Sequence, residues 1–485
     1  MARIYTLSNV PPEVSAYGMA KYSRSSASMR DTLLELSQQK AEQFLNTFYF
    51  AYGHASIADL AHVALAVEDI SILAAMDVVD EPLWDGQERS TRYQTFHDAP
   101  YYRPAEAPPD FDGLARSLFA QYRSLTDDAY EAYADRHPKP AAMAEGVYRR
   151  TLRARAFDVA RYLLPLATLT SLGQVTNARV LEQQIARLLA SPWPELQAIG
   201  AEMKQAATVA APFDLLSERL QRAGLRVPDE VRAELETGPS VPTLLKHAEP
   251  ARFLANVRTA MRAIAAEVLG SWPVEPPDLV RCHRPGSDQD TALSLLLYRE
   301  SALPFGRVAA VVADLPPAVK REILETAFQQ RGPHDAWPSA FRQAPLLFDL
   351  TVDIGAFRDL NRHRRLFKTM QEISPDLGYA VPEPLTEWGR DAGYRSRLDA
   401  HYAKLSALAA SLQPYLLPLA HRRRALFAMD WAEAAYLIEL RSKSSGHFSY
   451  RRLANAMHQE LTRLDPALAR HIRVTPYHDF NPLER

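Results

Sequence analysis

Residues 162–167 read YLLPLA, and residues 415–420 repeat the same six letters. Each copy ends a stretch in which apolar residues recur three and four positions apart, which predicts a long amphipathic helix. An exact six-residue match seldom arises by chance, although short leucine-rich helical sequences do recur in proteins. The repeat therefore suggests that the chain contains two copies of one fold.

Other landmarks keep the same order in both halves of the chain. Each half begins with a short strand, a loop and a helix. Next come a helix that ends in aromatic residues, a turn, and the pair Asp-Ile. A short segment that begins with tyrosine and ends with proline follows. The matched segments are residues 1–25 with 279–301, 48–71 with 328–355, and 102–104 with 379–382. Shared order is typical of an internal repeat. We expect a first domain at residues 1–240, a helical connector at residues 241–275 and a second domain at residues 276–485.

Hydrophobic periodicity predicts the secondary structure between these landmarks. Helices are expected at residues 27–50, 148–166, 177–189 and 396–417, and β-rich runs at residues 2–7, 60–67, 279–282 and 346–352. The last run belongs to the stretch LLFDLTVDIG, which could also begin a helix. Strands and long helices mixed without strict βαβ alternation indicate an α+β fold, helix-rich with short-stranded sheets.

The composition is that of an ordinary globular protein. The 485 residues are 47% hydrophobic and 24% charged, with a formal net charge of −2. Without a basic excess the chain is not expected to wrap nucleic acid, and an anionic ligand must be held by local arginines. The single cysteine, Cys282, excludes an intrachain disulfide and is interpreted as an inert thiol in a reducing compartment. Because membrane-spanning runs and a signal-peptide pattern are both missing from the sequence, we expect a cytoplasmic protein.

Two polar clusters are candidate anion sites. Residues 361–365 read NRHRR, and residues 87–93 read QERSTRY. Arginine offers a planar fork that binds a phosphate through two hydrogen bonds, and a turn rich in amides and hydroxyls can surround a phosphate. The first cluster can also be a solvated helix face, and the second a polar surface loop.

Three single residues also have two readings. Asn177 opens a predicted helix, so it either contacts a ligand or caps the helix. Arg161 lies on an apolar helix and needs an anionic partner, which a salt bridge or a ligand phosphate would supply. Arg441 closes an apolar helix, where it either reaches a site or interacts with the helix dipole. The sequence has no GxGxxG after a strand, P-loop, HExxH or paired CxxC, so neither a classical dinucleotide fold nor a metal site is expected.

Together these residues resemble the flavin-dependent thymidylate synthase family. The family pattern is a Gly-His-x-Ser/Thr turn, Arg-His-Arg, seven residues, Ser-x-Arg, an arginine before Leu-Pro, Asn-Ala-Arg and a late Leu-Arg. The first half matches it through residues 53–56 (GHAS), Ser90, Arg92, Arg161 and residues 176–179 (TNAR). It departs where residues 80–82 replace Arg-His-Arg, and where Leu188, beside Arg187, replaces the late arginine.

The second half shows the opposite pattern. Arg362, His363 and Arg364 form an intact Arg-His-Arg, and Arg441 supplies the late arginine. The replaced positions are residues 374–376 for Ser-x-Arg, Pro414 for the arginine before Leu-Pro, and residues 430–432 for Asn-Ala-Arg. The family's sites resemble pockets shared between subunits of a tetramer, so each half keeps one subunit's role. The resemblance therefore implies a composite site, and a homodimer that imitates a four-domain tetramer.

The resemblance also implies roles for the matched residues. The uridylate would be bound by Glu88, Ser90, Thr91, Arg92, Arg161, Arg362 and Arg441. The FAD cofactor would be bound by Ser56, Glu88, Asn177, Arg179, Arg362, His363 and Arg364. Arg441 would be the catalytic residue, because a fixed cation favours the N3-ionised base.

The implied reaction is the reductive methylation of dUMP to dTMP. The carbon would come from methylenetetrahydrofolate and the hydride from reduced flavin, with NADPH as the reductant. One departure stands out: the family carries a glutamine three residues before Arg-His-Arg, whereas this chain has Asp359 there and Asp77 in the first half. Two other readings stay open. One is a non-catalytic flavin- or nucleotide-binding homologue, and the other is a nucleic-acid-binding protein that uses residues 361–368 and 421–424.

Overall fold

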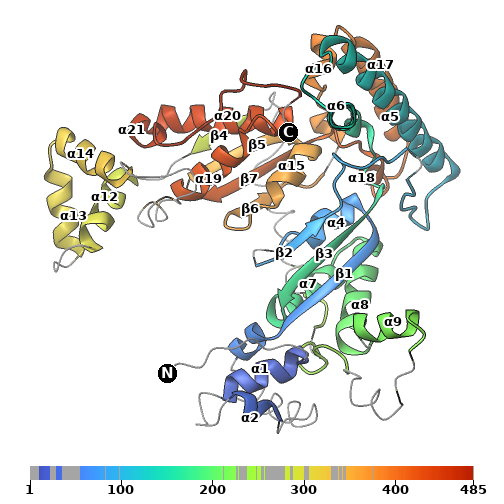
Figure 1. Cartoon of the computed structure of the whole chain (residues 1–485), viewed down its shortest axis with the longest axis horizontal. Coiled ribbons are helices and arrows are strands. Elements are labelled where there is room, and N and C mark those ends of the chain that lie inside the picture. The colour runs from blue at the N-terminus through green and yellow to red at the C-terminus, as the bar shows by residue number, and fades with distance from the viewer. Residues whose placement is uncertain are drawn as a thin grey trace. The chain divides into compact units, whose positions relative to one another are not determined.

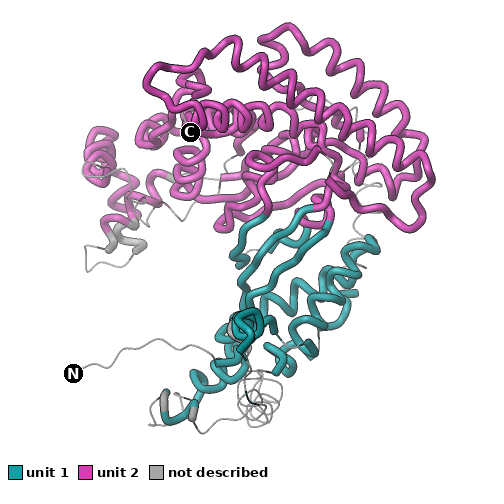
Figure 2. Tube along the Cα trace, turned by 45° about the vertical axis from the view of Figure 1, so that its right-hand side comes forward, with its two compact units in different colours: residues 1–70, 77–88, 170–273 teal, residues 71–76, 89–169, 274–485 magenta. Residues whose placement is uncertain are grey.

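The structure, a computed structural model, divides into two compact units (Figure 2). Unit 1 consists of residues 1–70, 77–88 and 170–273, and unit 2 consists of residues 71–76, 89–169 and 274–485. The residues that the structure describes are 10–21, 29–34, 55–81, 83–97, 99–210, 212–225, 228, 238–246, 248–252, 256, 279–283, 288–299, 305–328, 337, 341, 346–373 and 375–483. Unit 2 thus joins a long first-half segment to the second half, and the domain boundaries expected from the sequence stay a prediction.

Unit 1 is built on a three-stranded sheet in the order β1-β3-β2. The strands are β1 (His62–Ser71), β2 (Asp85–Glu88) and β3 (Leu169–Asn177). β2 runs antiparallel to β3, with Asp85 opposite Val175. The described helices are α1 (Pro12–Lys21), α2 (Met29–Leu34), η2 (Ala55–Leu60), α7 (Ala178–Leu189), α8 (Pro194–Thr208) and α9 (Leu215–Arg222) (Figure 1). Helix α4 (Ile72–Val78) follows β1, and its residues 72–76 belong to unit 2.

Two sequence expectations are confirmed in unit 1. The run at residues 60–67 forms part of β1, and the helix expected at residues 177–189 is α7. Asn177 caps α7 by accepting a hydrogen bond from Val180 N at 3.0 Å, as short polar side chains at this position do. The expected strand at residues 2–7 and most of the expected helix at residues 27–50 lie outside the described residues, as does most of the expected connector.

Unit 2 contains a four-stranded antiparallel sheet in the order β4-β5-β7-β6. The strands are β4 (Val280–His283), β5 (Leu346–Asp353), β6 (Phe367–Met370) and β7 (Arg422–Met429). Helices α15 (Ile354–Asn361) and α20 (Phe448–Leu464) contact the sheet, and α19 (Trp431–Arg441) packs against α20 (Figure 1). The stretch at residues 346–353 is therefore a strand, and the helix begins only at Ile354, where Asp353 caps it.

The remaining helices of unit 2 complete a helix-rich fold. They are α5 (Pro109–Arg136), α6 (Glu145–Ala160), η3 (Arg161–Leu163), α12 (Asp288–Arg299), α13 (Phe305–Asp314), α14 (Pro317–Phe328), η5 (Pro375–Leu377), α16 (Glu383–Glu387), α17 (Asp391–Leu405), α18 (Gln413–Leu416) and α21 (Pro466–Ala469). The prediction of a helix-rich fold with small antiparallel sheets is confirmed. The single helix expected at residues 396–417 is wrong, because α17 ends at Leu405 and α18 begins only at Gln413. Among the described helices, none has the length and apolar character needed to cross a membrane.

The two YLLPLA segments pair with each other inside unit 2. Leu166 N donates to Leu417 O at 2.9 Å, and Leu419 N donates to Leu164 O at 2.9 Å. Pro165 faces Pro418 between them in an antiparallel bridge. Exchanging the two copies turns the first hydrogen bond into the second, so a local twofold axis passes between the prolines, as in an isologous interface.

Candidate functional site

Asp359, on α15, lies where positive charge from both halves of the chain converges. The residue is 8% exposed, and Arg161 Nη1 approaches its Oδ2 at 3.5 Å. Burial alone would raise the pKa of Asp359, but the charges of Arg161, Arg362, Arg92 and Arg441 lower it below its ordinary value. Asp359 is therefore ionised at neutral pH within a group of four arginines, two from each half.

Arg161 is the first residue of η3 and is 2% exposed. Its neighbour Gly355 leaves room for it, because a Cβ there would lie 3.4 Å from Arg161 Nη2 and 3.1 Å from Asp353 Oδ1. Within the described part of the chain, Arg161 Nε and Nη2 and Asp359 Oδ2 have no hydrogen-bond partner. Buried polar groups are costly without partners, so these atoms suit a ligand or bound water.

Arg92, by contrast, already has its partners. Its Nε and Nη2 donate to the two carboxylate oxygens of Asp158 at 2.6 and 2.9 Å, and its Nη1 donates to Tyr450 Oη at 2.9 Å. Burial would raise the pKa of Asp158, but the charge of Arg92 holds it well below its ordinary value. The fork expected to clamp a phosphate is therefore occupied by a buried aspartate from α6.

Tyr450, on α20, connects the first-half and second-half arginines. The guanidinium carbon of Arg92 lies 5.7 Å from the centre of its ring, and that of Arg441 lies 5.4 Å away. Both distances are typical of cation–π contacts. Sequence reasoning missed Tyr450 and Asp158, because neither belongs to a motif and Tyr450 is 358 positions from Arg92.

Arg441, at the end of α19, is fixed by three contacts. Its Nε donates to His363 Nε2 at 3.0 Å, its Nη2 donates to the Asp359 carbonyl oxygen at 2.5 Å, and its guanidinium lies over Tyr450. His363 Nδ1 in turn lies 3.4 Å from Glu433 Oε1. His363 is 5% exposed, so the structure gives this predicted cofactor contact an internal partner on each nitrogen.

The Ser90–Thr91 turn lies directly before Arg92. Ser90 Oγ accepts a hydrogen bond from Arg92 N at 3.2 Å, and Thr91, which is 3% exposed, lies with its Oγ1 at 3.5 Å from Arg161 Nη1. The structure thus places Thr91 beside Arg161. Glu88, at the end of β2, belongs to unit 1.

The other residues assigned to FAD are divided between the units. Arg362 and Arg364 follow α15 and are exposed, whereas Ser56, Asn177 and Arg179 belong to unit 1. Ser56 is exposed in η2, Asn177 is the cap of α7, and Arg179 forms an ion pair with Asp59 at 2.9 Å. Gly53 and His54 lie outside the described residues.

Unit 1 repeats the arginine geometry with a different partner. Arg187 Nη2 donates to the Asp77 carbonyl oxygen at 2.8 Å and its Nε donates to Glu81 at 2.9 Å, as Arg441 does to Asp359 and His363. From the sequence, Leu188 takes the place of the late arginine; Leu188 is fully buried, and its neighbour Arg187 makes these contacts. In unit 1 the arginine is therefore kept, but it is neutralised by a glutamate.

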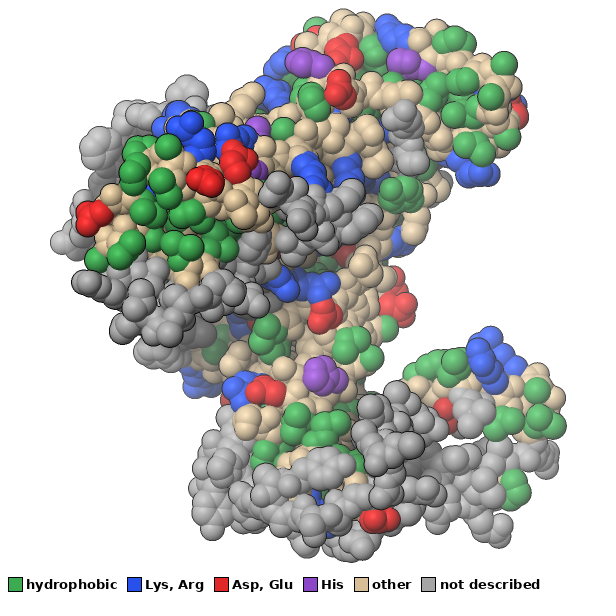
Figure 3. Space-filling view, turned by 60° about the vertical axis from the view of Figure 1, so that its left-hand side comes forward, with side chains coloured by type: hydrophobic (Ala, Val, Ile, Leu, Met, Phe, Trp, Pro, Cys, Tyr) green, Lys and Arg blue, Asp and Glu red, His purple; other side chains and the backbone are tan. Residues whose placement is uncertain are grey.

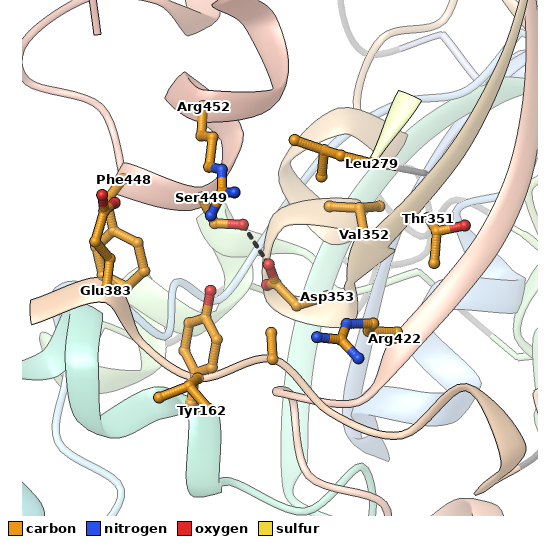
Figure 4. A pocket seen from close by; sticks show the side chains of 12 residues that line it. Tyr162, Leu279, Thr351, Val352, Asp353, Glu383, Arg422, Phe448, Ser449 and Arg452 are labelled. Carbon is orange, nitrogen blue, oxygen red and sulfur yellow. Dashed lines mark hydrogen bonds between the residues drawn. The ribbon is translucent and has the colours of Figure 1, made fainter. Parts of the chain in front are cut away.

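A cavity of about 450 Å³ lies in unit 2 beside the start of α15 (Figure 4). Its lining residues are Tyr162, Leu279, Thr351, Val352, Asp353, Ala380, Val381, Glu383, Arg422, Phe448, Ser449 and Arg452. Asp353 accepts hydrogen bonds from Ser449 Oγ and from Ala356 N, and burial raises its pKa. Burial also raises the pKa of Glu383, which accepts from the Tyr477 hydroxyl. The described residues hold no group of three side chains that could bind a metal.

The two stretches proposed for nucleic acid combine exposed and buried side chains, with Arg362, Arg364 and Arg365 exposed. Asn361 is 3% exposed and His421 is fully buried. His421 Nδ1 contacts the Tyr402 hydroxyl at 2.9 Å. On the face drawn in Figure 3, basic and acidic side chains are interspersed.

Comparison with known proteins gives one family. The model of the family described as thymidylate synthase complementing protein matches residues 7–213 and 315–467. A UPF0159 protein of Chlamydia muridarum is 27% identical over 519 residues, which cover 98% of this chain and 92% of that protein. A flavin-dependent thymidylate synthase of Clostridium tetani is 28% identical over 170 residues, which cover 35% of this chain and 67% of that protein.

Solved structures of the same kind of enzyme match more weakly. The flavin-dependent thymidylate synthase of Helicobacter pylori, complexed with FAD and dUMP, is 15% identical and covers 41% of this chain and 100% of its own. The TM-score is 0.30.

Proposed function

Because the chain belongs to the family described as thymidylate synthase complementing protein, we propose that it is an FAD-dependent thymidylate synthase. It would convert dUMP to dTMP with methylenetetrahydrofolate as the carbon donor and NADPH as the reductant. The observation that carries this proposal is the group of four arginines around Asp359, because a nucleotide phosphate needs buried or focused positive charge.

The site would be composite because the chain would be a tandem duplication. The twofold pairing of the YLLPLA segments supports this, as does the strand order, which is β1-β3-β2 in unit 1 and β5-β7-β6 within the sheet of unit 2. Side-chain caps also recur: Asn177 caps α7 after β3, and Asp430 caps α19 after β7. On this proposal the domains are residues 1–240 and 276–485, and two chains form a homodimer.

The phosphate would be held mainly by Arg161, with Thr91 and Ser90 as hydroxyl donors and Glu88 ordering the loop. Arg161 fits this role because two of its nitrogens are buried without a hydrogen-bond partner among the described residues. Arg92 would support the turn and contribute long-range charge, since Asp158 occupies its fork. Arg362, exposed at the end of α15, would complete the positive lining.

The FAD would be held by the loop after α15. Arg362 and Arg364 fit, because both are exposed and carry donors for the pyrophosphate. His363 fits less directly, since it is buried against Glu433 and Arg441. Ser56, Asn177 and Arg179 keep the FAD contacts that the resemblance implies for them. When bound, the flavin supplies the hydride.

Arg441 would act on the pyrimidine. Its guanidinium is held by His363 and the Asp359 carbonyl, so its position costs little reorganisation when a base binds. A fixed cation beside the base would stabilise the N3-ionised form, which carries negative charge. Arg441 would thereby favour the attack of the base on the folate-borne methylene.

A second candidate function is a flavin- or nucleotide-binding homologue without turnover. It is favoured by the aspartate pairing of Arg92, and by Asp359 at the position where the resembled family has glutamine. Growth of a thymidylate-synthase-deficient host without thymidine separates the two functions. We expect growth with the wild-type chain and none with Arg362→Ala or Ser90→Ala; absence of growth with stable wild-type protein would favour the second function.

A further inference from the structure

Behind Arg441, two buried side chains form a continuous line of contacts. Glu433 Oε1 lies 3.4 Å from His363 Nδ1, and His363 Nε2 accepts a hydrogen bond from Arg441 Nε at 3.0 Å. His363 and Glu433 are each 5% exposed. Helix α19 supplies Glu433 in its first turn and Arg441 in its last, so one helix holds the imidazole at both nitrogens.

These contacts determine which nitrogen of the His363 imidazole carries the proton. Arginine has only donors, so His363 Nε2 must offer its lone pair to Arg441. The ring proton then resides on Nδ1, where it points to the Glu433 carboxylate, and the carboxylate in turn favours that tautomer. A second proton on Nε2 would set an N–H group against the N–H of the guanidinium.

We infer that Glu433 and His363 are positioning residues for Arg441, and that they hold its guanidinium only while His363 is neutral. The inference rests on the proposed function, because the orientation of Arg441 matters through the base it would contact. With Nε and one Nη2 hydrogen used on the protein side, the outer edge of the guanidinium faces the ligand in a single orientation. Such preorganisation is what a charge-stabilising arginine requires.

The groups around His363 keep the ring neutral near pH 7. Burial is the largest cause and lowers the pKa of His363, and the charges of Arg441 and Lys368 lower it further, while Glu433 acts in the opposite direction. The ring of Tyr436 packs edge-on at 5.8 Å and adds no charge. His363 is therefore protonated only at a lower pH than an ordinary histidine.

Two substitutions of His363 separate its two contacts. In His363→Gln the amide oxygen reaches the place of Nε2 and can still accept from Arg441, but it gains no proton in acid. In His363→Asn the shorter amide reaches only the place of Nδ1, so Arg441 loses its acceptor. Calorimetric titration with dUMP between pH 5 and 8, on variants whose thermal unfolding is checked, measures the consequence.

We expect His363→Asn to weaken dUMP binding about tenfold at pH 8, the effect of one lost hydrogen bond to a charged group. His363→Gln should bind dUMP more tightly than His363→Asn at pH 8, and its affinity relative to the wild type should rise as the pH falls from 8 to 5. The nucleotide phosphate titrates alike in all variants, so the ratio between them isolates His363. As a matched pair on α19, Glu433→Gln should weaken binding, whereas Glu439→Gln should not, because the half-buried Glu439 accepts from Arg473 N and has no contact with His363 among the hydrogen bonds of the described residues.

Unchanged affinity in folded His363→Asn, or a constant ratio of wild type to His363→Gln across pH, would overturn the positioning role. If the wild type binds no dUMP, the proposed function fails, and imidazole ¹⁵N shifts of the ligand-free protein decide the inference instead. At pH 7.5 they should show His363 protonated on Nδ1, and the tautomer should change in Glu433→Gln. A proton on Nε2 in the wild type would contradict the inference.

Discussion

Buried side chains, rather than exposed ones, set the charge of the candidate site. The motifs identified the arginines from sequence alone, because their spacing matches a family pattern. The partners Asp158, Tyr450 and Glu433 could not be identified in this way. An aspartate on an apolar helix looks the same in sequence whether it faces solvent or a guanidinium, and only the fold brings Arg92 to Tyr450.

The Arg92–Asp158 pair gives a prediction for stability. Asp158→Asn leaves the guanidinium of Arg92 buried without its counter-charge, so the free energy of unfolding should fall by about 3–5 kcal/mol. Denaturant titration followed by circular dichroism measures this change. Glu145→Gln, which breaks an ion pair with Arg149 on an exposed face, should leave the midpoint unchanged. A loss as small in Asp158→Asn as in Glu145→Gln would contradict the buried pair.

The buried histidines give a prediction for pH. Burial lowers the pKa of His363, His401 and His447, so between their folded values and about 6.5 the unfolded chain binds more protons than the folded one. Stability therefore rises with pH in that window and is lost as pH falls below about 6.5. Denaturant midpoints at pH 7.5, 6.0 and 5.0 should decrease in that order, and His447→Gln should flatten the decrease. A midpoint that is constant from pH 7.5 to 5.0 would show that these rings are not buried in the neutral form.

At the scale of elements, helix α15 shows what the sequence could and could not give. The strand at residues 346–353 and the Arg-His-Arg after the helix were predictable from periodicity and motif. The position where strand becomes helix was not, because the apolar pattern of LLFDLTVDIG fits both. Asp353 decides it by capping α15, and Gly355 then allows Arg161 to approach the helix.

The close approach of Arg161 to Gly355 predicts how one added methyl group at Gly355 affects stability and dUMP binding. In Gly355→Ala the new Cβ would press on Asp353 Oδ1 and Arg161 Nη2, so we expect a loss of about 1–3 kcal/mol of stability and weaker dUMP binding. Gly393, in α17, has no atom within 4 Å of its added Cβ, and Gly393→Ala should be neutral or slightly stabilising. Thermal unfolding and calorimetry compare the two. Equal behaviour of the two variants would mean that Arg161 does not lie against α15.

At the scale of the whole molecule, the two halves hold an arginine through the same pair of contacts, but the side chain that accepts from its Nε differs in charge. Arg441 contacts a histidine in the second half, whereas Arg187 makes the same contact to Glu81 in the first. The repeat was visible in the sequence through YLLPLA, but the twofold pairing of its two copies was not, since identical letters do not say whether segments meet. On the proposed duplication, the first half pairs its arginine with a glutamate, while the second half pairs its arginine with a histidine.

We propose that one anion site draws arginines from both halves, and a calorimetric double-mutant cycle with dUMP measures whether it does. Arg161→Ala and Arg441→Ala should each weaken binding at least tenfold, since each removes a charge-assisted hydrogen bond. Their effects should not be additive, whereas the exposed Arg395→Ala should leave binding unchanged. Wild-type affinity in a folded Arg161→Ala or Arg441→Ala variant would contradict the account.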